Sequence, residues 1–199
     1  MSIAIEPRSS GIGVPSFGNH LLQLVGEPFL FSRRSYGDEL VLHFGERLLG
    51  PVRRNKHGEF RYEHGTHSLH LRGSAWVIKG GRIPSIANGG FHADPQPELA
   101  EGVGQGNNER EPPITPGARV TAAIPFSVER EAVKGFGLRI DLADGSSAIV
   151  LPTPEELDEE PIPVGTTLPE IADWELRTPH GILVVGPGLK WEFTTPEGV

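Results

Sequence analysis

Short segments of alternating apolar and polar residues predict β-strands in this chain. In residues 40–44 and 138–142, leucine, isoleucine or phenylalanine occupies every second position. A period of two is typical of a strand that buries one of its faces. Asp144-Gly145 follows the second segment and precedes the apolar residues 148–151. Because glycine accepts the positive φ of a tight turn, this dipeptide predicts a β-hairpin.

The two ends of the chain share a layout. Residues 28–35 and 118–128 are apolar runs, and each is followed by a turn and one of the alternating segments. Residues 71–80 and 176–186 both begin with Leu-Arg and continue through a short turn into an apolar strand and a glycine. We therefore predict a mainly β protein of two similar antiparallel meander halves with little helix. An internal duplication is one interpretation; the other is that unrelated meanders share this order of turns and strands.

Glycine and proline are concentrated in the middle of the chain. The 199 residues include 26 Gly and 19 Pro, and residues 79–117 keep no apolar period. Structureless loops of that length are uncommon inside one compact domain. We predict an N-terminal β half (1–80), a Gly/Pro-rich segment (81–117) and an acidic C-terminal β half (118–199). The middle segment is either a linker between the halves or a long loop that becomes ordered on a partner.

Acidic residues outnumber basic ones, and they are distributed unevenly. The net charge is −8 at pH 7, and the isoelectric point is about 5.5. Residues 1–90 carry +4, residues 91–130 carry −3 and residues 131–199 carry −9. The negative total disfavours nucleic acid as a partner, because phosphate binding requires a basic surface.

The residues and motifs that are missing exclude further classes of function. The chain has no cysteine, which rules out disulfides, thiolate zinc sites and a cysteine nucleophile. It has no signal-peptide pattern and no apolar segment near the roughly 20 residues that span a bilayer, so we expect a cytoplasmic protein with no membrane partner. The sequence contains no G-x-S-x-G motif and no phosphate-binding glycine loop followed by a helix. We therefore predict no enzymatic activity, no catalytic residue and no cofactor.

Four histidines, His57, His64, His67 and His70, lie close together in the sequence and raise the question of a metal site. On a strand, His64 and His70 would share a face while His67 would point away. Two ligands are fewer than zinc usually requires, so we predict no metal site and keep His64 and His70 as its only candidates. The alternative interpretation is that these histidines are exposed side chains of a hairpin.

The acidic back half contains the residues that we expect to contact a partner. A dense acidic loop accelerates encounter with a basic protein, although the same run could be a solvated loop without a partner. Trp174 follows this run and is predicted to be an exposed interface anchor, whereas Trp76 and Trp191 are expected in the core. The predicted partner-binding residues are Glu155, Glu156, Asp158, Glu159, Glu160, Asp173, Trp174 and Glu175.

A basic cluster lies in the front half of the chain, close to two aromatic residues, Phe60 and Tyr62. Its members are Arg47, Arg53, Arg54, Lys56 and Arg61. Such a cluster suggests nucleic acid, but the chain as a whole is acidic and the run is short. The cluster could equally face the acidic half of the same chain or of a second copy, which makes a homo-oligomer one of the expected assemblies.

The C-terminal third loosely resembles a family of small, uncharacterised bacterial β-rich proteins. The resemblance rests on the Asp144-Gly145 hairpin, on Trp174-Glu175-Leu176 after the acidic run, and on Gly186-Pro187-Gly188. The family pattern has Glu-x before the tryptophan, whereas this chain has Ala172-Asp173. Proteins of this kind are similar to immunity proteins, which neutralise a toxin domain by binding it; this is an analogy of fold and charge.

These observations favour a non-catalytic protein-binding module. The leading hypothesis is a bacterial immunity or inhibitor protein that neutralises a basic toxin or effector domain through its acidic surface. Two alternatives stay open: a structural or assembly component of a bacterial or viral particle, and a metal-binding protein built on the histidines.

Overall fold

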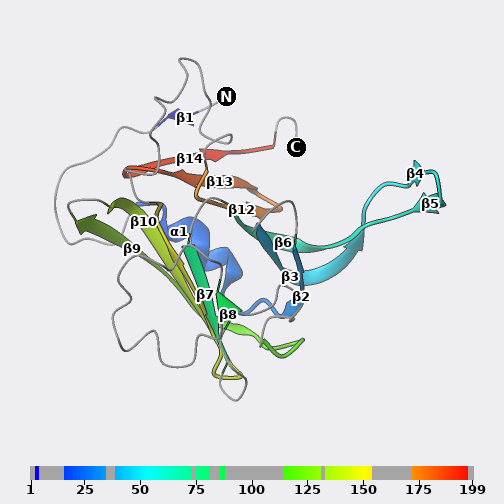
Figure 1. The fold of residues 1–199 in the computed structure, drawn as a ribbon, viewed down its shortest axis with the longest axis horizontal. Helices are drawn as coiled ribbons and strands as arrows, with labels where there is room; N and C mark the ends of the chain where they lie inside the picture. The colour runs from blue at the N-terminus through cyan, green and yellow to red at the C-terminus, as the bar shows by residue number, and fades with distance from the viewer. Residues whose placement is uncertain are drawn as a thin grey trace.

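The computed structural model describes residues 3–4, 16–34, 39–72, 75–80, 86–87, 114–130, 133–153 and 172–196. Within these residues, two antiparallel β-sheets pack against each other, with a short helical segment between them at one end (Figure 1). The prediction of a mainly β protein with little helix is confirmed. No helix in the described part of the chain is long and apolar enough to cross a membrane.

The larger sheet has seven strands, and every neighbouring pair in it is antiparallel. In spatial order they are β1 (Ile3–Ala4), β14 (Lys190–Thr194), β13 (Gly181–Gly186), β12 (Trp174–Thr178), β6 (Glu63–Leu71), β3 (Leu40–Leu49) and β2 (Phe29–Arg34).

The smaller sheet has five strands, also antiparallel throughout. In spatial order they are β8 (Ile86–Ala87), β7 (Ala75–Lys79), β11 (Ser147–Leu151), β10 (Val133–Leu142) and β9 (Val120–Arg130). The predicted hairpin joins β10 to β11, and its Gly145 has a φ of 83°. A separate two-stranded ribbon consists of β4 (Arg53–Asn55) and β5 (Gly58–Phe60).

The core fills the space between the two large sheets. Alternate residues of β3 and β10 face it, as the period of two predicts: Leu42 and Phe44 are fully buried on one side, and Leu138 and Ile140 on the other. Trp76 is buried as expected, and Trp191 packs against the same cluster from a partly buried position.

A short helical segment closes one end of this core. It consists of α1 (Gly18–Leu21) and the 3-10 turn η1 (Leu22–Leu24), which bury Leu21 and Leu24. The preceding Phe17 is fully buried, and its ring meets that of Phe136 on β10 edge to face at a centroid distance of 5.1 Å.

The two predicted halves do not form separate sheets. β12 pairs with β6 in the larger sheet, and β11 pairs with β7 in the smaller one, so each sheet combines strands from residues 1–80 and 118–199. β6 leads into β7 of the other sheet, whereas β12 leads into β13 of the same sheet. The internal duplication is therefore not confirmed. The boundaries 1–80, 81–117 and 118–199 stay predictions, and most of the middle segment lies outside the described residues.

Candidate functional site

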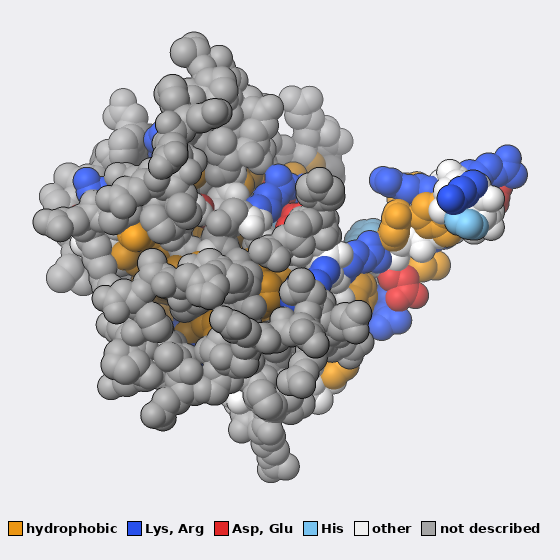
Figure 2. Space-filling view, in the orientation of Figure 1, with side chains coloured by type: hydrophobic (Ala, Val, Ile, Leu, Met, Phe, Trp, Pro, Cys, Tyr) orange, Lys and Arg blue, Asp and Glu red, His pale blue; other side chains and the backbone are white. Residues whose placement is uncertain are grey.

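One hairpin extends far beyond the two sheets, and we call its residues 47–64 the arm. It contains the outer ends of β3 and β6, and β4 and β5 close its tip. Figure 1 shows the arm leaving the sheets, and Figure 2 shows it standing clear of the rest of the molecule. Among the described residues, β4 pairs only with β5.

A β-bulge marks the base of the arm. The register between β3 and β6 shifts after the pair Phe44–His67 and resumes at Arg47–Gly65. Gly45 lies in the bulge with a φ of 86°, and a Cβ atom there would overlap the Thr66 hydroxyl. Bulges bend a strand and change its direction. Glycine at this position therefore permits the bend at which the arm leaves the sheet.

Large apolar side chains on the arm are exposed to solvent. Leu48, Leu49, Val52 and Tyr62 are between 40% and 60% exposed. The first six residues of β3, by contrast, are all buried. Successive residues of a strand point to opposite faces, so Leu48 and Leu49 expose apolar surface on both faces of the arm.

The charges of the arm are only partly compensated by its own residues. Arg47 forms an ion pair of 3.0 Å with Glu63, and Arg54 forms one of 3.1 Å with Glu59. The other three cations, Arg53, Lys56 and Arg61, form no ion pair with any described carboxylate. With five Lys/Arg and two Glu, residues 47–64 carry a net charge of +3.

Arginines stack on the aromatic rings along the arm. The guanidinium carbons of Arg33 and Arg53 lie 4.7 Å and 5.6 Å from the centroid of the Tyr62 ring. The Phe60 and Tyr62 rings meet edge to face at 5.0 Å. Each cation–π contact contributes about 0.5–1 kcal/mol at an exposed site. These contacts restrain the side chains of the arm in a surface that is both apolar and cationic.

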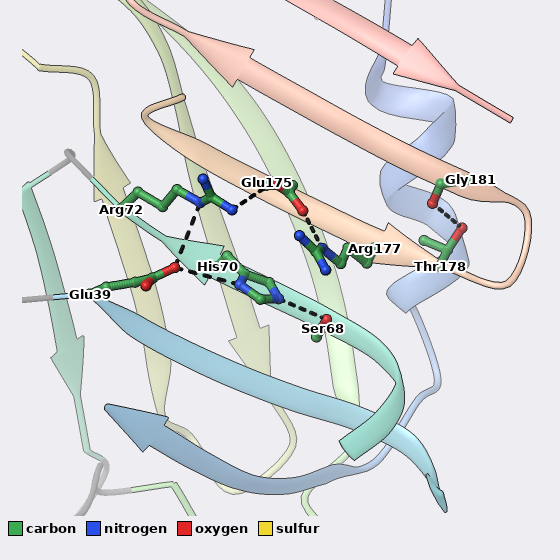
Figure 3. Close-up of polar contacts among 8 residues, drawn as sticks. All are labelled: Glu39, Ser68, His70, Arg72, Glu175, Arg177, Thr178 and Gly181. Carbon is green, nitrogen blue, oxygen red and sulfur yellow. Dashed lines mark hydrogen bonds and ion pairs between the residues drawn. The ribbon is translucent and has the colours of Figure 1, made fainter. Parts of the chain in front are cut away.

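A second polar site lies on the face of the larger sheet that points away from the core (Figure 3). The Glu175 carboxylate, only 3% exposed, accepts bonds from the guanidiniums of Arg177 and Arg72, the latter at 3.2 Å. Glu39 lies 3.6 Å from both Arg72 Nε and His70 Nδ1. We call these five residues, together with Ser68, the polar cluster. Such charged partners offset the cost of burying the Glu175 carboxylate.

The polar cluster contains an arrangement that resembles a serine nucleophile relay. Ser68 Oγ lies 3.1 Å from His70 Nε2, and Glu39 faces the other ring nitrogen. A serine nucleophile also needs donors for the developing oxyanion. The two nearby guanidiniums, of Arg72 and Arg177, are both bound to Glu175. We therefore interpret the polar cluster as a structural network that links β6 to β12.

Burial lowers the pKa of two histidines near these sites, His43 and His70. Burial is the largest cause for His43, whose pKa falls from 6.5 to about 4, and electrostatic interactions with His70, Arg33 and His64 lower it further. Burial is also the largest cause that lowers the pKa of His70. The charge of Arg177 lowers it further, whereas the interaction with Glu175 raises it. The neutral ring of His43 has a structural use, because its Nδ1 accepts the backbone N–H of Gly65 at 3.3 Å. That bond lies at the base of the arm.

The four clustered histidines do not converge on one point. His57 is exposed at the tip of the arm, and His67 is buried beside Thr66. His64 and His70 lie on one strand, about 20 Å apart at the usual rise per residue. His64 Nδ1 contacts the Gly65 carbonyl, and no described group of three or more ligand side chains could hold a metal ion. The alternative of exposed hairpin histidines is correct for His57 and wrong for His67.

Five of the eight predicted partner-binding residues lie outside the described residues. They are Glu155, Glu156, Asp158, Glu159 and Glu160.

The remaining three predicted contact residues are buried, so the prediction that they form an exposed surface is wrong. Trp174 is fully buried, and Asp173 and Glu175 are each 2% exposed. Alternation along β12 directs Trp174 into the core, where its Nε1–H donates to the Phe136 carbonyl at 2.9 Å. Asp173 accepts a bond from the Thr153 backbone N–H at 3.3 Å. These residues join strands to one another.

Comparison with known proteins gives no relative: no family model, curated protein or solved structure matches the chain. The loose resemblance to a bacterial family therefore stays a prediction.

Sequence reasoning identified the cations of the arm but not the arm itself. The missed signal is that Leu48, Leu49 and Val52 lie among those cations, in a segment whose other residues are typical of polar turns. The polar cluster left no sequence signal, because β6 and β12 are about a hundred residues apart in the chain and only strand pairing brings their side chains together.

Proposed function

We propose that this chain is a non-catalytic protein-binding protein of the assembly type, and that the arm is its binding element. One observation carries the proposal: β3 is buried up to the bulge and then presents Leu48 and Leu49 to solvent on a projecting hairpin. An isolated two-stranded hairpin is at best marginally stable in water. Packing of the arm against a partner would bury these leucines and stabilise it.

The chemistry of the arm favours a protein partner with an apolar and acidic surface. Leu49 and Val52 require apolar contacts, and Arg53, Lys56 and Arg61 require negative charge. Interfaces are enriched in tyrosine and arginine at their centre, which describes Tyr62 and the arginines stacked on it. A nucleic acid would use the cations and leave the leucines exposed.

The immunity or inhibitor function remains a prediction from the sequence. Of its predicted contact residues, only the acidic ones between 155 and 160 remain, because Asp173, Trp174 and Glu175 are buried. The assembly alternative is favoured by the arm, which is an observation of the structure.

Site-specific photo-crosslinking in the cells that make this protein tests the proposal. We call the described residues outside the arm the body. A photoreactive amino acid would replace Leu49 on the arm and, in a separate variant, Lys190, which is exposed on β14 of the body. We expect protein adducts of discrete mass from position 49 and far fewer from position 190. Equal labelling from both positions, or adducts to nucleic acid from position 49, would contradict the proposal.

A further inference from the structure

We infer that the partner is a protein with a cleft that encloses the arm and places carboxylates beside Tyr62. This rests on the function proposed above and adds the shape and charge of the partner's site. Leu48 is 40% exposed and Leu49 is 60% exposed. A flat surface can cover only one face of a two-stranded ribbon, and the leucine on the other face would stay in water. Because stacked sheets lie about 10 Å apart, two walls that cover both faces would stand roughly 20 Å apart.

Strand pairing shows that these two leucines lie on opposite faces. Residues directly opposite each other in an antiparallel pair point to the same face, and successive residues alternate. Leu48 pairs with His64, and Leu49 pairs with Glu63. Each face of the arm therefore has a leucine that needs an apolar contact.

The face that contains Leu48 also contains the aromatic rings, and we call it the aromatic face. The pairing continues to Tyr62, whose carbonyl accepts the Gly50 N–H at 2.8 Å, so Tyr62 shares the face of Leu48. The Phe60 ring meets the Tyr62 ring edge to face at 5.0 Å, and Arg53 pairs with Phe60. This face thus combines apolar and aromatic groups with a cation.

The face that contains Leu49 holds the ion pairs of the arm, and we call it the ion-paired face. Glu63 lies opposite Leu49 and binds Arg47 at 3.0 Å. Arg54 and Glu59 lie opposite each other and form an ion pair of 3.1 Å. Most of the charge on this face is therefore neutralised within the arm, and its leucine is the group that requires a partner.

Two cations on the aromatic face flank one ring. The guanidinium carbons of Arg53 and, from β2, Arg33 lie 5.6 Å and 4.7 Å from the centroid of the Tyr62 ring. Neither forms an ion pair with a described carboxylate, whereas on the ion-paired face this holds for Arg61 alone. A guanidinium binds a carboxylate through two parallel N–H···O bonds. The wall that meets the aromatic face should therefore supply carboxylates beside Tyr62.

The edges of the arm favour a protein cleft over a lipid surface. Beyond the bulge, the outer end of β3 pairs with β6 and with no other described strand. Backbone N–H and C=O groups along both edges of this ribbon lack a strand partner there. Hydrocarbon would leave such groups unsatisfied, whereas a protein cleft can bind them or leave them in water.

Adjacent positions on opposite faces test the enclosure. In the cells that make this protein, a photoreactive amino acid would replace Leu48 in one variant and Leu49 in another, with Lys190 on β14 as the control position. We expect both arm positions to give adducts with the same protein and position 190 to give far fewer. Adducts from position 49 alone, or adducts with two different proteins, would overturn the enclosure and leave the proposed function standing. Labelling from position 49 that is no stronger than from position 190 would contradict the proposed function itself.

Charge reversals test the carboxylates of the partner. Each variant would carry the photoreactive residue at position 49, and the yield of the adduct would be measured. Arg33→Glu/Arg53→Glu reverses the cations beside Tyr62, and Lys134→Glu/Lys190→Glu reverses two exposed cations of the body. We expect the first pair to lower the yield about tenfold or more and the second to leave it unchanged. No loss in either variant, or equal loss in both with unchanged melting temperatures, would overturn the inference.

An uncharged double variant on the ion-paired face controls for position. Arg54→Gln/Glu59→Gln removes one exposed ion pair and keeps the net charge. The adduct yield should stay within about twofold of that of the parent, because this ion pair is satisfied within the arm. A loss as large as that of Arg33→Glu/Arg53→Glu would place the charge recognition on the wrong face and overturn the inference.

Two binding assays on purified protein cover the other classes of partner. We expect no binding to vesicles of phosphatidylserine and phosphatidylcholine, and none to a single-stranded oligonucleotide at physiological salt. Vesicle binding that Leu48→Ser/Leu49→Ser abolishes would replace the protein cleft with a membrane surface. Oligonucleotide binding that Arg33→Glu/Arg53→Glu abolishes would replace it with a nucleic acid.

Discussion

The two halves of β3 place similar side chains in opposite environments. From Leu40 to Gly45 the strand lies inside the larger sheet and is buried, and from Glu46 to Leu49 it is exposed. Both halves pair with β6, so backbone hydrogen bonding does not distinguish them. The difference is that the second sheet covers the first half and nothing among the described strands covers the second.

This comparison separates stability from binding within one strand. Apolar residues of the body contribute to folding by filling the core, whereas those of the arm contribute little until a partner covers them. Substitutions in the body should therefore change the free energy of unfolding, and substitutions in the arm should change association.

The largest effect on folding is expected from Trp174→Ala. This tryptophan is fully buried, links the two sheets through its bond to the Phe136 carbonyl, and contacts the Phe17 ring. Removing such a side chain costs about 3–5 kcal/mol. Tyr62→Ala on the arm is the matched aromatic control and should cost less than about 1 kcal/mol. Urea unfolding measures both, and equal losses would contradict the distinction between body and arm.

The polar cluster should give the next largest effect. Glu175→Gln keeps the shape of the side chain but removes the buried charge that both Arg72 and Arg177 contact. Hydrogen bonds to charged groups contribute about 1.5–3 kcal/mol each, and the partial exposure of both arginines reduces the loss, so we expect about 2–3 kcal/mol. Binding of a partner through the arm should be unaffected. A change smaller than that of Glu59→Gln, whose carboxylate is exposed on the arm, would contradict the role of the cluster.

Acid should destabilise the body through His43. Its pKa is about 4 in the folded protein and 6.5 in the unfolded chain, so the unfolded chain binds more protons between these values. The contribution of the neutral ring is complete above pH 6.5 and declines as the pH falls toward 4. Between pH 6.5 and pH 5 this amounts to about 2 kcal/mol.

His43→Asn isolates this effect, because an asparagine oxygen can accept the Gly65 N–H in place of Nδ1. The variant should lose stability less steeply with acid than the wild type, and His57→Gln at the exposed tip should not change the slope. Parallel pH profiles for all three proteins would contradict the assignment.

The smallest effect on folding is expected from Leu48→Ser/Leu49→Ser on the arm. Both side chains are exposed, so the free energy of unfolding of the monomer should change by no more than about 0.5 kcal/mol for each. Association should nevertheless weaken at least tenfold. A loss of stability comparable to that of Trp174→Ala, measured under dissociating conditions, would indicate that the arm is part of the folding core.

Strands and hairpins could be predicted where side-chain alternation is strong. The alternation of Leu40, Leu42 and Phe44 predicted both the strand and its buried face. Asp144-Gly145 predicted the turn between β10 and β11. The pairing of β6 with β12 could not be predicted, because it depends on contacts between distant segments.

Local sequence also failed to predict the burial of Trp174 and the exposure of the arm. Trp174 lies next to acidic residues and was expected at the surface, yet strand alternation directs it inward with Leu176. The arm was not predicted because leucines in a strand normally indicate that the strand is buried. Whether a second sheet covers Leu48 and Leu49 depends on the whole fold and not on the local sequence.

Amide hydrogen exchange with and without the partner captured at position 49 tests the central claim most directly, because it reports on the arm and on the sheets in the same sample. The account predicts that amides of residues 47–64 exchange quickly in the free protein and become protected when the partner binds. Amides of residues 40–44 should be protected equally in both states. Partner binding that leaves the exchange of residues 47–64 unchanged would contradict the claim that the arm is the binding element.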